Sequence, residues 1–215
     1  MKTKLHCQHG LSLIELAVIV ATVVLVAGFI LPVIYRRPCR SQRIACVNNL
    51  KQIGLSYRLY SNDHNDQFPF AVSNQDGGTR GFVDSPQVFR HYESMSNELN
   101  IPRILVCPHD AQKVRGTNFL GPLSNTNVSY FVGLDANETK PERLLSGDRN
   151  ITGGVLSKGF LRMFNTNSTA GWTTSIHTNT GNIGLADGSV QQVTAQTLQR
   201  QLQIQSLDII RLAIP

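Results

Sequence analysis

The chain has few charged residues, and it lacks internal repeats and low-complexity segments. Its net charge of +6 is modest for 215 residues. Much of the excess lies in Lys2, Lys4 and a cluster of arginines, so the rest of the chain is close to neutral. Nucleic-acid binding rests on many phosphate contacts from Lys and Arg, so this distribution argues against a nucleic-acid partner. The clustered side chains, which favour lipid phosphates or acidic partners, are Arg36, Arg37, Arg40 and Arg43.

Local signatures of catalytic sites are also absent. His177, Asp187 and Ser189 supply the residue types of a hydrolase triad. No nucleophile elbow, oxyanion-hole motif or metal-binding helix accompanies them. We therefore expect no enzymatic activity. His177 and Asp187 are expected to have structural roles, His177 by satisfying polar groups across a hairpin and Asp187 by accepting backbone N–H groups within its own turn.

Metal-binding patterns are weak. Asp63 and Asp66 lie in a polar segment with calcium-type oxygen donors, and Asp187 is a third candidate ligand. The polar segment lacks the glycine and the closing glutamate of an EF-hand loop. Cys107 and His109 lack a paired ligand set at zinc spacing. The sequence thus predicts no cofactor, with Ca²⁺ as the one ion left open.

The four cysteines do not fix a redox state. Cys7 lies in the first ten residues, which leaves Cys39, Cys46 and Cys107 for the remainder. Cys39 and Cys46 are seven residues apart, or about 10.5 Å along one helix, which is too far for a disulfide. In an oxidising compartment, Cys107 could pair with either of them.

The most informative segment is the apolar run from Leu16 to Ile34 with the motif that precedes it. Residues 10–16 read Gly-Leu-Ser-Leu-Ile-Glu-Leu, and the polar residues before them contain no acid. An ordinary secretory signal has an apolar core of only about 7–15 residues. The run is therefore expected to be a transmembrane helix. Glu15 at its start is a candidate functional residue, because an unpaired carboxylate in a membrane is costly.

This arrangement resembles the N-terminal signal of type IV pilins and of type II secretion pseudopilins. The resemblance implies that prepilin peptidase cuts between Gly10 and Leu11 and that the new N-terminus, Leu11, is methylated. It also implies a helix bend at Pro32. Glu15 is four positions after Leu11, so it lies on the same helix face as the new amine. Glu15 of one subunit could therefore pair with the Leu11 amine of its neighbour during assembly.

The predicted function is a structural subunit of a type II secretion pseudopilus or a type IV pilus-like filament. Its expected partners are prepilin peptidase, other copies, minor pseudopilins, the inner-membrane assembly platform and the lipid bilayer. The expected location is the bacterial inner membrane as a single-pass protein, with a cytoplasmic N-terminus and a periplasmic head, and then the filament. The arginines after the run favour the opposite orientation, but a signal read by an enzyme takes precedence. The alternatives are a minor pilin or adhesin, and an anchored periplasmic enzyme or ligand-binding protein.

A second helical pattern follows the apolar run. Apolar residues recur at three- and four-residue steps from Ile44 to Tyr60, which is typical of an amphipathic helix. Together the two segments predict one helix of about 50 residues, continuous or bent at a proline and about 75 Å long. The expected boundaries are a leader over 1–10, a transmembrane and assembly helix over 11–35, an amphipathic helix over 36–61 and a globular periplasmic head over 62–215.

The head is expected to contain a small antiparallel β-meander. Short strands are predicted at 104–106, 127–131 and 144–146, and two more around Ile183 and Val190, joined by a turn at Asp187-Gly188. Thr194 is expected to cap a short helix after the meander. The fold class is therefore α+β and pilin-like, with a long N-terminal helix packed on the meander.

Nine residues separate His177 from Asp187-Gly188. This His-x9-Asp-Gly element resembles one near the C-terminus of a large bacterial family of prepilin-type, type II secretion protein G-like subunits. Three other segments resemble that family too, namely residues 48–54 (Asn-Asn-Leu-Lys-Gln-Ile-Gly), 106–108 (Val-Cys-Pro) and 146–150 (Ser-Gly-Asp-Arg-Asn). The resemblance implies an architecture and a pathway, but no ligand.

Overall fold

The computed structural model describes residues 12–34, 38–165, 167–205 and 207–215. The chain divides into two compact units, Met1–Pro38 and Cys39–Pro215. Its α-helices are α1 (Leu13–Ile34), α2 (Pro38–Asp63), α3 (Arg90–Glu93), α4 (Ser96–Leu99) and α5 (Ala195–Ile204). Its 3₁₀ helices are η1 (Pro69–Ala71), η2 (Asn74–Asp76), η3 (Arg80–Phe82), η4 (Pro102–Leu105) and η5 (Asn125–Asn127).

The expected single N-terminal helix is replaced by two helices. α1 ends at Ile34 and α2 begins at Pro38. Proline lacks a backbone N–H and disfavours helical backbone in the residue before it, so Pro38 suits the first position of a new helix. The prediction of one long N-terminal helix of about 50 residues, continuous or bent at a proline, is therefore wrong.

The membrane predictions also need correction. Among the described residues, no helix combines the length and the apolar character needed to cross a lipid bilayer. This finding contradicts the transmembrane helix over 11–35, the single-pass inner-membrane location and the membrane-inserted prepilin.

α2 is amphipathic, as predicted. Leu50, Ile53, Tyr57 and Tyr60 recur at helical spacing and are buried, while Ile44 is exposed. The buried face packs against aromatic rings from the following loops. Tyr57, for example, contacts Phe68 edge to face at 5.7 Å between ring centroids.

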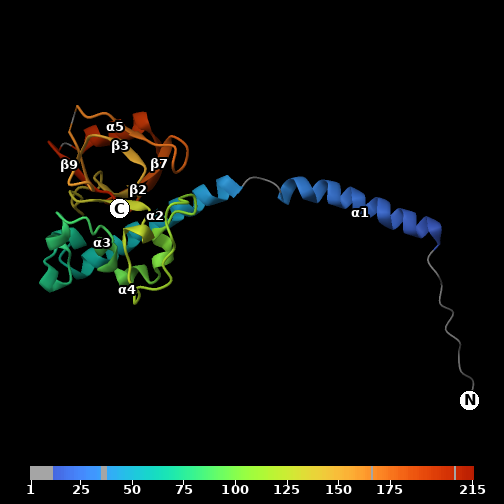
Figure 1. Ribbon diagram of the computed structural model, residues 1–215, viewed down its shortest axis with the longest axis horizontal. Coiled ribbons are helices and arrows are strands. Elements are labelled where there is room, and N and C mark those ends of the chain that lie inside the picture. Colours follow the sequence, from blue (N-terminus) through green and yellow to red (C-terminus); the bar gives the residue numbers. More distant parts are fainter. Residues whose placement is uncertain (1–11, 35–37, 166, 206) are drawn as a thin grey trace, which may run out of the picture. The chain divides into compact units, whose positions relative to one another are not determined.

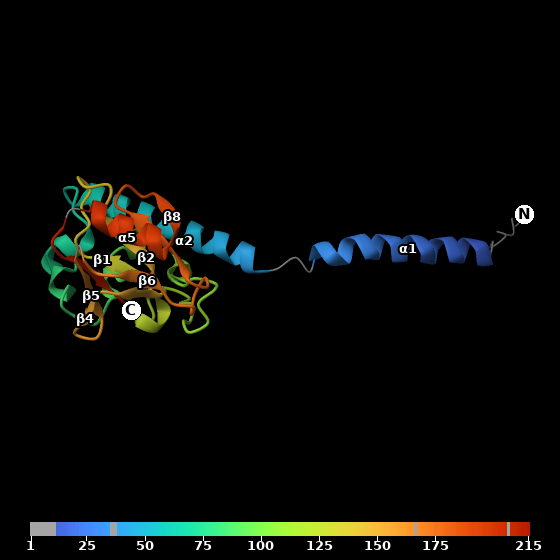
Figure 2. The ribbon, with the colours of Figure 1, turned by 90° about the horizontal axis from the view of Figure 1, so that it is seen from above.

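Nine strands are present within the described residues. They are β1 (Tyr130–Gly133), β2 (Leu144–Asp148), β3 (Ile151–Gly153), β4 (Val155–Ser157), β5 (Leu161–Phe164), β6 (Ala170–Trp172), β7 (Thr180–Leu185), β8 (Val190–Thr194) and β9 (Ile210–Ala213). Seven of them form an antiparallel sheet in the order β4-β5-β9-β1-β2-β7-β8, and β3 pairs with β6 separately. Figure 2 shows β4 and β5 together at one edge of the sheet.

The sheet has a hydrophobic core on each face. Tyr130 and Val132 belong to the core that contains α2, whereas Phe131 between them belongs to the core that contains Leu198 and Leu202 of α5. This alternation follows from the period of two along a strand. Figure 1 shows α2, α3 and α4 on one side of the sheet and α5 on the other.

The predicted elements of the head are partly confirmed. β2 and the β7–β8 hairpin lie where expected, and Thr194 caps α5 by accepting from the N–H of Thr197. The strand predicted at 104–106 is wrong, because Pro102 opens the 3₁₀ helix η4 there. The sheet is also larger than a meander, since β4, β5 and β9 extend it.

Candidate functional site

Cys46 and Cys107 form a disulfide between α2 and the segment that follows η4. Their Cα atoms are 5.1 Å apart, and neither side chain is exposed. Cys46 lies on the buried face of α2, one turn before Leu50, which directs its sulfur into the core. The structure thus selects Cys46 as the partner of Cys107. The side chain of Cys39 is not among those that the structure describes.

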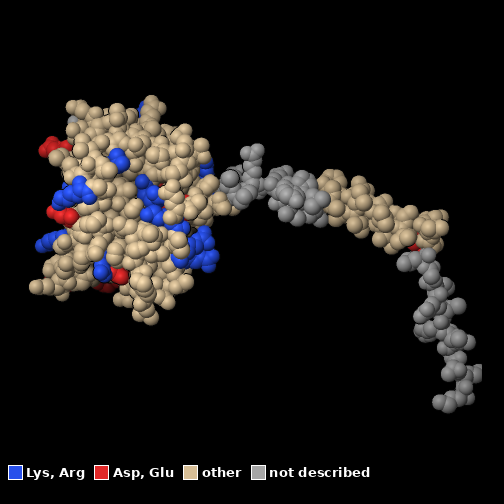
Figure 3. Space-filling view, in the orientation of Figure 1, with Lys and Arg blue, Asp and Glu red and all other residues tan. Residues whose placement is uncertain are grey.

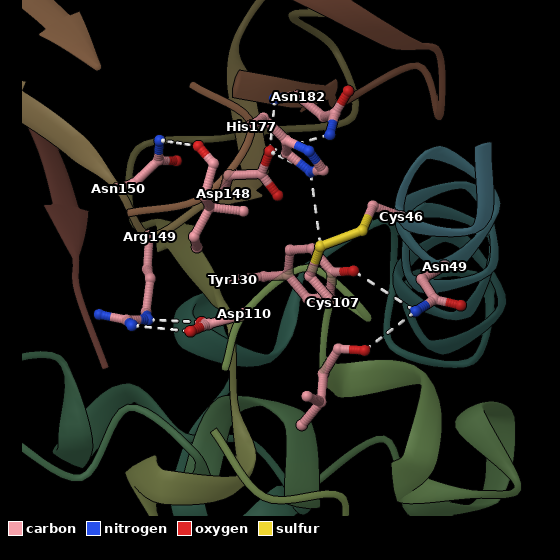
Figure 4. The surroundings of a disulfide bond; sticks show 12 residues. Cys46, Asn49, Cys107, Asp110, Tyr130, Asp148, Arg149, Asn150, His177 and Asn182 are labelled. Carbon is pink, nitrogen blue, oxygen red and sulfur yellow. Dashed lines mark hydrogen bonds and ion pairs between the residues drawn. A yellow bond between two sulfur atoms is a disulfide. The ribbon is translucent and has the colours of Figure 1, made fainter. Parts of the chain in front are cut away.

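His177 lies directly beside this disulfide. Its Nε2 atom is 3.4 Å from Sγ of Cys107 and 3.5 Å from Oδ2 of Asp148. His177 and Asp148 are buried as completely as the disulfide. Figure 4 shows the imidazole between the disulfide and the Asp148 carboxylate. The imidazole therefore lies between the disulfide and the C-terminal end of β2.

The loop that carries His177 is held in an uncommon conformation. Three consecutive residues have left-handed backbone, with φ of 51° at His177, 47° at Thr178 and 58° at Asn179. Such angles are unfavourable for residues other than glycine and persist where surrounding contacts enforce them.

Asn150 holds the backbone on both sides of these three residues. Its Nδ2 donates to the carbonyls of Thr173, Ile176 and Thr180, at 3.0, 3.1 and 3.3 Å. Arg43 of α2 donates to the carbonyl of His177 at 3.3 Å. These bonds hold the backbone segment that carries the imidazole.

Asp148 is a buried carboxylate with an incomplete set of partners. Its Oδ2 accepts from the backbone N and the Nδ2 of Asn182, at 2.7 and 2.8 Å. Its Oδ1 is buried and has no hydrogen-bond partner among the described residues. Burial raises the pKa of Asp148 to about 7, although the bonds from Asn182 oppose this shift. Burial, with the nearby charges of His109 and Arg43, lowers the pKa of His177 to about 4, so its imidazole is neutral at pH 7.

Arg149, the residue after the end of β2, forms an ion pair with Asp110. It donates from Nε and Nη2 to the two carboxylate oxygens of Asp110, at 2.7 and 2.9 Å. Burial alone would raise the pKa of Asp110, but the bonds and the positive charge of Arg149 lower it overall. This bidentate pair holds the loop after Cys107 against β2.

The four segments that carry the family resemblance meet at this place. Asn49 of α2 donates to the carbonyl of Val106 at 3.2 Å and to the hydroxyl of Tyr130 at 3.4 Å. Residues 106–108 contribute Cys107 of the disulfide, and residues 146–150 contribute the Asp148 carboxylate and its neighbours. His177 contributes the imidazole. Figure 4 shows these side chains around the disulfide. We call Cys46, Cys107, His177 and Asp148 the buried cluster.

Asp187 and Gly188 lie at the other end of β7. Oδ1 of Asp187 accepts from the N–H of Ser189 at 2.8 Å, which confirms the predicted turn role. Arg58 of α2 donates to the Asp187 carbonyl at 3.0 Å. Gly188, at the turn, has a φ of 84°, which favours glycine. Both ends of the His-x9-Asp-Gly element thus hold α2 against the sheet, and His177 lies too far from Asp187 for a catalytic triad.

Other predicted site residues have simpler surroundings. Gly10 and Leu11 lie outside the described residues. Pro32 lies in the last turn of α1, and its side chain is not among the described ones. Asp63 and Asp66 are exposed at the C-terminal end of α2. Within the described part of the chain, neither they nor Asp187 belong to a group of three potential metal ligands.

Glu15 closes a capping box at the start of α1. The N–H of Ser12 donates to Oε2 of Glu15 at 2.8 Å, and the N–H of Glu15 donates to Oγ of Ser12 at 3.2 Å. This reciprocal pair satisfies two N–H groups that a helix start leaves free. The Ser-x-x-Glu pattern at residues 12–15 is the sequence signal for it.

Sequence reasoning missed the buried polar neighbours of His177. Asp148, Asn150 and Asn182 were not singled out as site residues, although 146–150 carried part of the resemblance. Comparison with protein-family models, with characterised proteins and with solved structures finds no match for this chain.

Proposed function

We propose that this chain is a structural subunit of a filament of the pseudopilus or type IV pilus kind, and that it assembles through α1. The observation that carries the proposal is the exposed apolar surface of α1. Leu13, Ile14 and Phe29 are 86%, 77% and 77% exposed. Exposed apolar surface of this extent marks an interaction site.

The apolar side chains are distributed around the helix. Val18, Ile19 and Val20 are consecutive, so they point in directions about 100° apart, and all three are about half exposed. The face of α1 that Figure 3 shows carries no Lys or Arg in its described part. A helix that is apolar on every face needs neighbours on every face. A helical filament supplies them, because each copy contributes the same helix to several others.

Glu15 is the one charged residue of α1, and it supports a defined position of each helix in the filament. A carboxylate surrounded by apolar helices is costly unless it is paired. The amine of Leu11, exposed by cleavage after Gly10, is the cation that the resemblance implies. One pairing position then fixes how far neighbouring helices are shifted along each other.

The capping box allows the charge of Glu15 to be separated from its role in helix formation. Glu15→Gln removes the charge but retains a side chain that can close the box, whereas Ser12→Ala removes half of the box and retains the charge. If the charge directs assembly, filament yield in the native host falls at least tenfold for Glu15→Gln and changes little for Ser12→Ala. Electron microscopy and quantification of sheared filaments measure the yield.

Two controls accompany this experiment. The amount of folded protein is compared for each variant, and intact-mass spectrometry asks whether the chain begins at Leu11 with one added methyl group. Normal filaments from Glu15→Gln would contradict the charge-pairing role. A chain that stays uncleaved and monomeric in a host that processes related subunits would contradict the proposed function itself.

A further inference from the structure

The outward face of α2 carries exposed apolar side chains. Ile44, Leu55 and Leu59 are 54%, 58% and 48% exposed, although the opposite face of the same helix is buried in the core. Successive residues of a helix point in directions about 100° apart, so these three side chains lie within about 60° of one another around α2. We call this face, with Lys51 between Ile44 and Leu55, the outer stripe. An exposed apolar stripe of this kind marks an interaction site.

Lys51 is a cation without a partner within the outer stripe. It lies seven residues after Ile44 and four before Leu55, which places it on the same side of the helix. Arg43 and Arg58 of the same helix donate to backbone carbonyls. The ion pairs among the described residues, in contrast, do not include Lys51. Because an ammonium group covered by apolar surface is costly without an anion, the occupant of the stripe should be apolar and carry one negative charge.

The surface is hollowed at the N-terminal end of the stripe. A groove of about 490 Å³ lies there between α2 and β8. Its walls are formed by Arg43, Ile44, Val47, Asn48, Lys51 and Gln192. Side chains of a helix that lies on the stripe can enter this groove, so the surface suits a helical partner better than a flat one.

α1 has the composition that the outer stripe requires. It is apolar on every side, and its one charged residue is Glu15. Exposed apolar residues stand four and eight positions after Glu15 in α1, and four and eight positions after Lys51 in α2, namely Ile19 and Val23, and Leu55 and Leu59. Both helices rise by about 1.5 Å per residue. Two parallel helices with Glu15 beside Lys51 therefore bring both apolar pairs into contact.

The opposite direction suits the two helices less well. With Glu15 again beside Lys51, an antiparallel α1 would place Val23 opposite Arg43, which lies eight residues before Lys51. An exposed valine would then face a cation instead of a leucine. The parallel direction is the one that matches apolar residues with apolar residues.

We propose that α1 of one copy lies parallel to α2 of another copy, on its outer stripe, with Glu15 of the first beside Lys51 of the second. The inference rests on the proposed function, because it names the surface that α1 binds during filament assembly. It gives Glu15 a side-chain cation in addition to the Leu11 amine that the resemblance implies. The capping box uses Oε2 of Glu15, so Oε1 can accept from Lys51.

Cysteine cross-linking in the native host tests the contact. All copies carry Cys7→Ser and Cys39→Ser. One tagged copy carries Ile19→Cys and a differently tagged copy carries Leu55→Cys, and mild oxidation joins cysteines that touch. We expect at least about five times more mixed dimer than with Leu120→Cys in place of Leu55→Cys. Leu120 is 99% exposed, so it is the more accessible control, but it lies outside the stripe.

Charge variants test the ion pair. Lys51→Glu in the Leu55→Cys copy should lower the yield of mixed dimer about fivefold, because it replaces attraction by repulsion. The loss should be less than about twofold when the other copy carries Glu15→Gln, since no opposing carboxylate is then present. Lys140→Glu makes the same change of charge at an exposed lysine outside the stripe and should leave the yield unchanged.

The outcomes separate this contact from the filament itself. Equal yields with Leu55→Cys and Leu120→Cys would overturn the contact, as would more mixed dimer with Val47→Cys than with Leu55→Cys. Dimers of the Leu55→Cys copy with itself in place of mixed dimers, or a loss from Lys51→Glu that Glu15→Gln does not reduce, would also overturn it. Normal filaments beside any of these results would leave the proposed function intact. Specific cross-linking in a chain that forms no filaments would support the contact and contradict that function.

Discussion

Removal of the Cys46–Cys107 disulfide should strongly destabilise the head. The bond closes a loop of 61 residues. In the chain-entropy model, opening a loop of this length stabilises the unfolded state by about 4 kcal/mol. We therefore expect the Cys46→Ala, Cys107→Ala double variant to lose about 4 kcal/mol in its free energy of unfolding.

Urea unfolding measures this loss, with Trp172 as the reporter. It is the single tryptophan and is 6% exposed, so its fluorescence should change on unfolding. With a slope of about 2 kcal/mol per molar urea, the midpoint should fall by about 2 M. Cys39→Ser is the matched control and should leave the midpoint unchanged. A fall below about 0.5 M would refute the reasoning, because loop closure would then contribute little.

Three further predictions concern other contacts of the head. Burial lowers the pKa of His91 from 6.5 to about 4. Between these two values the unfolded chain binds a proton that the folded chain does not, so the free energy of unfolding falls as the pH falls. The loss from pH 6.5 to pH 4 is roughly 3 kcal/mol. As the pH is lowered from 6.5 to 4, the urea midpoint should therefore fall more steeply in the wild type than in His91→Gln. Equal dependence of the two midpoints on pH would exclude a contribution from His91. Arg149→Met should cost roughly 3 kcal/mol, because it leaves Asp110 buried and unpaired. Adding Asp110→Asn should recover part of that loss in the same urea assay, and no recovery would count against the pairing. Thr194→Ala should cost about 1 kcal/mol by removing the cap of α5, and an unchanged thermal midpoint would show that the cap is dispensable.

Local patterns predicted those parts of the fold that one segment decides. The spacing of Leu50, Ile53 and Tyr57 identified the buried face of α2, and Asp187-Gly188 identified the β7–β8 turn. The strand predicted at 104–106 failed because Pro102 favours a helical start, which outweighed the short apolar run.

Sequence by itself determined the amphipathic face of α2, the caps at Ser12 and Thr194, and the turn at Gly188, since each depends on residues within a few positions. Only the tertiary structure decided that Cys107 pairs with Cys46 and that His177 faces Asp148 rather than Asp187. Those contacts join residues 61 and 29 positions apart. They depend on which strands pair and in which register, and β9, near the end of the chain, lies between β5 and β1. Local periodicity reports the faces of one element but carries no information about which element covers them.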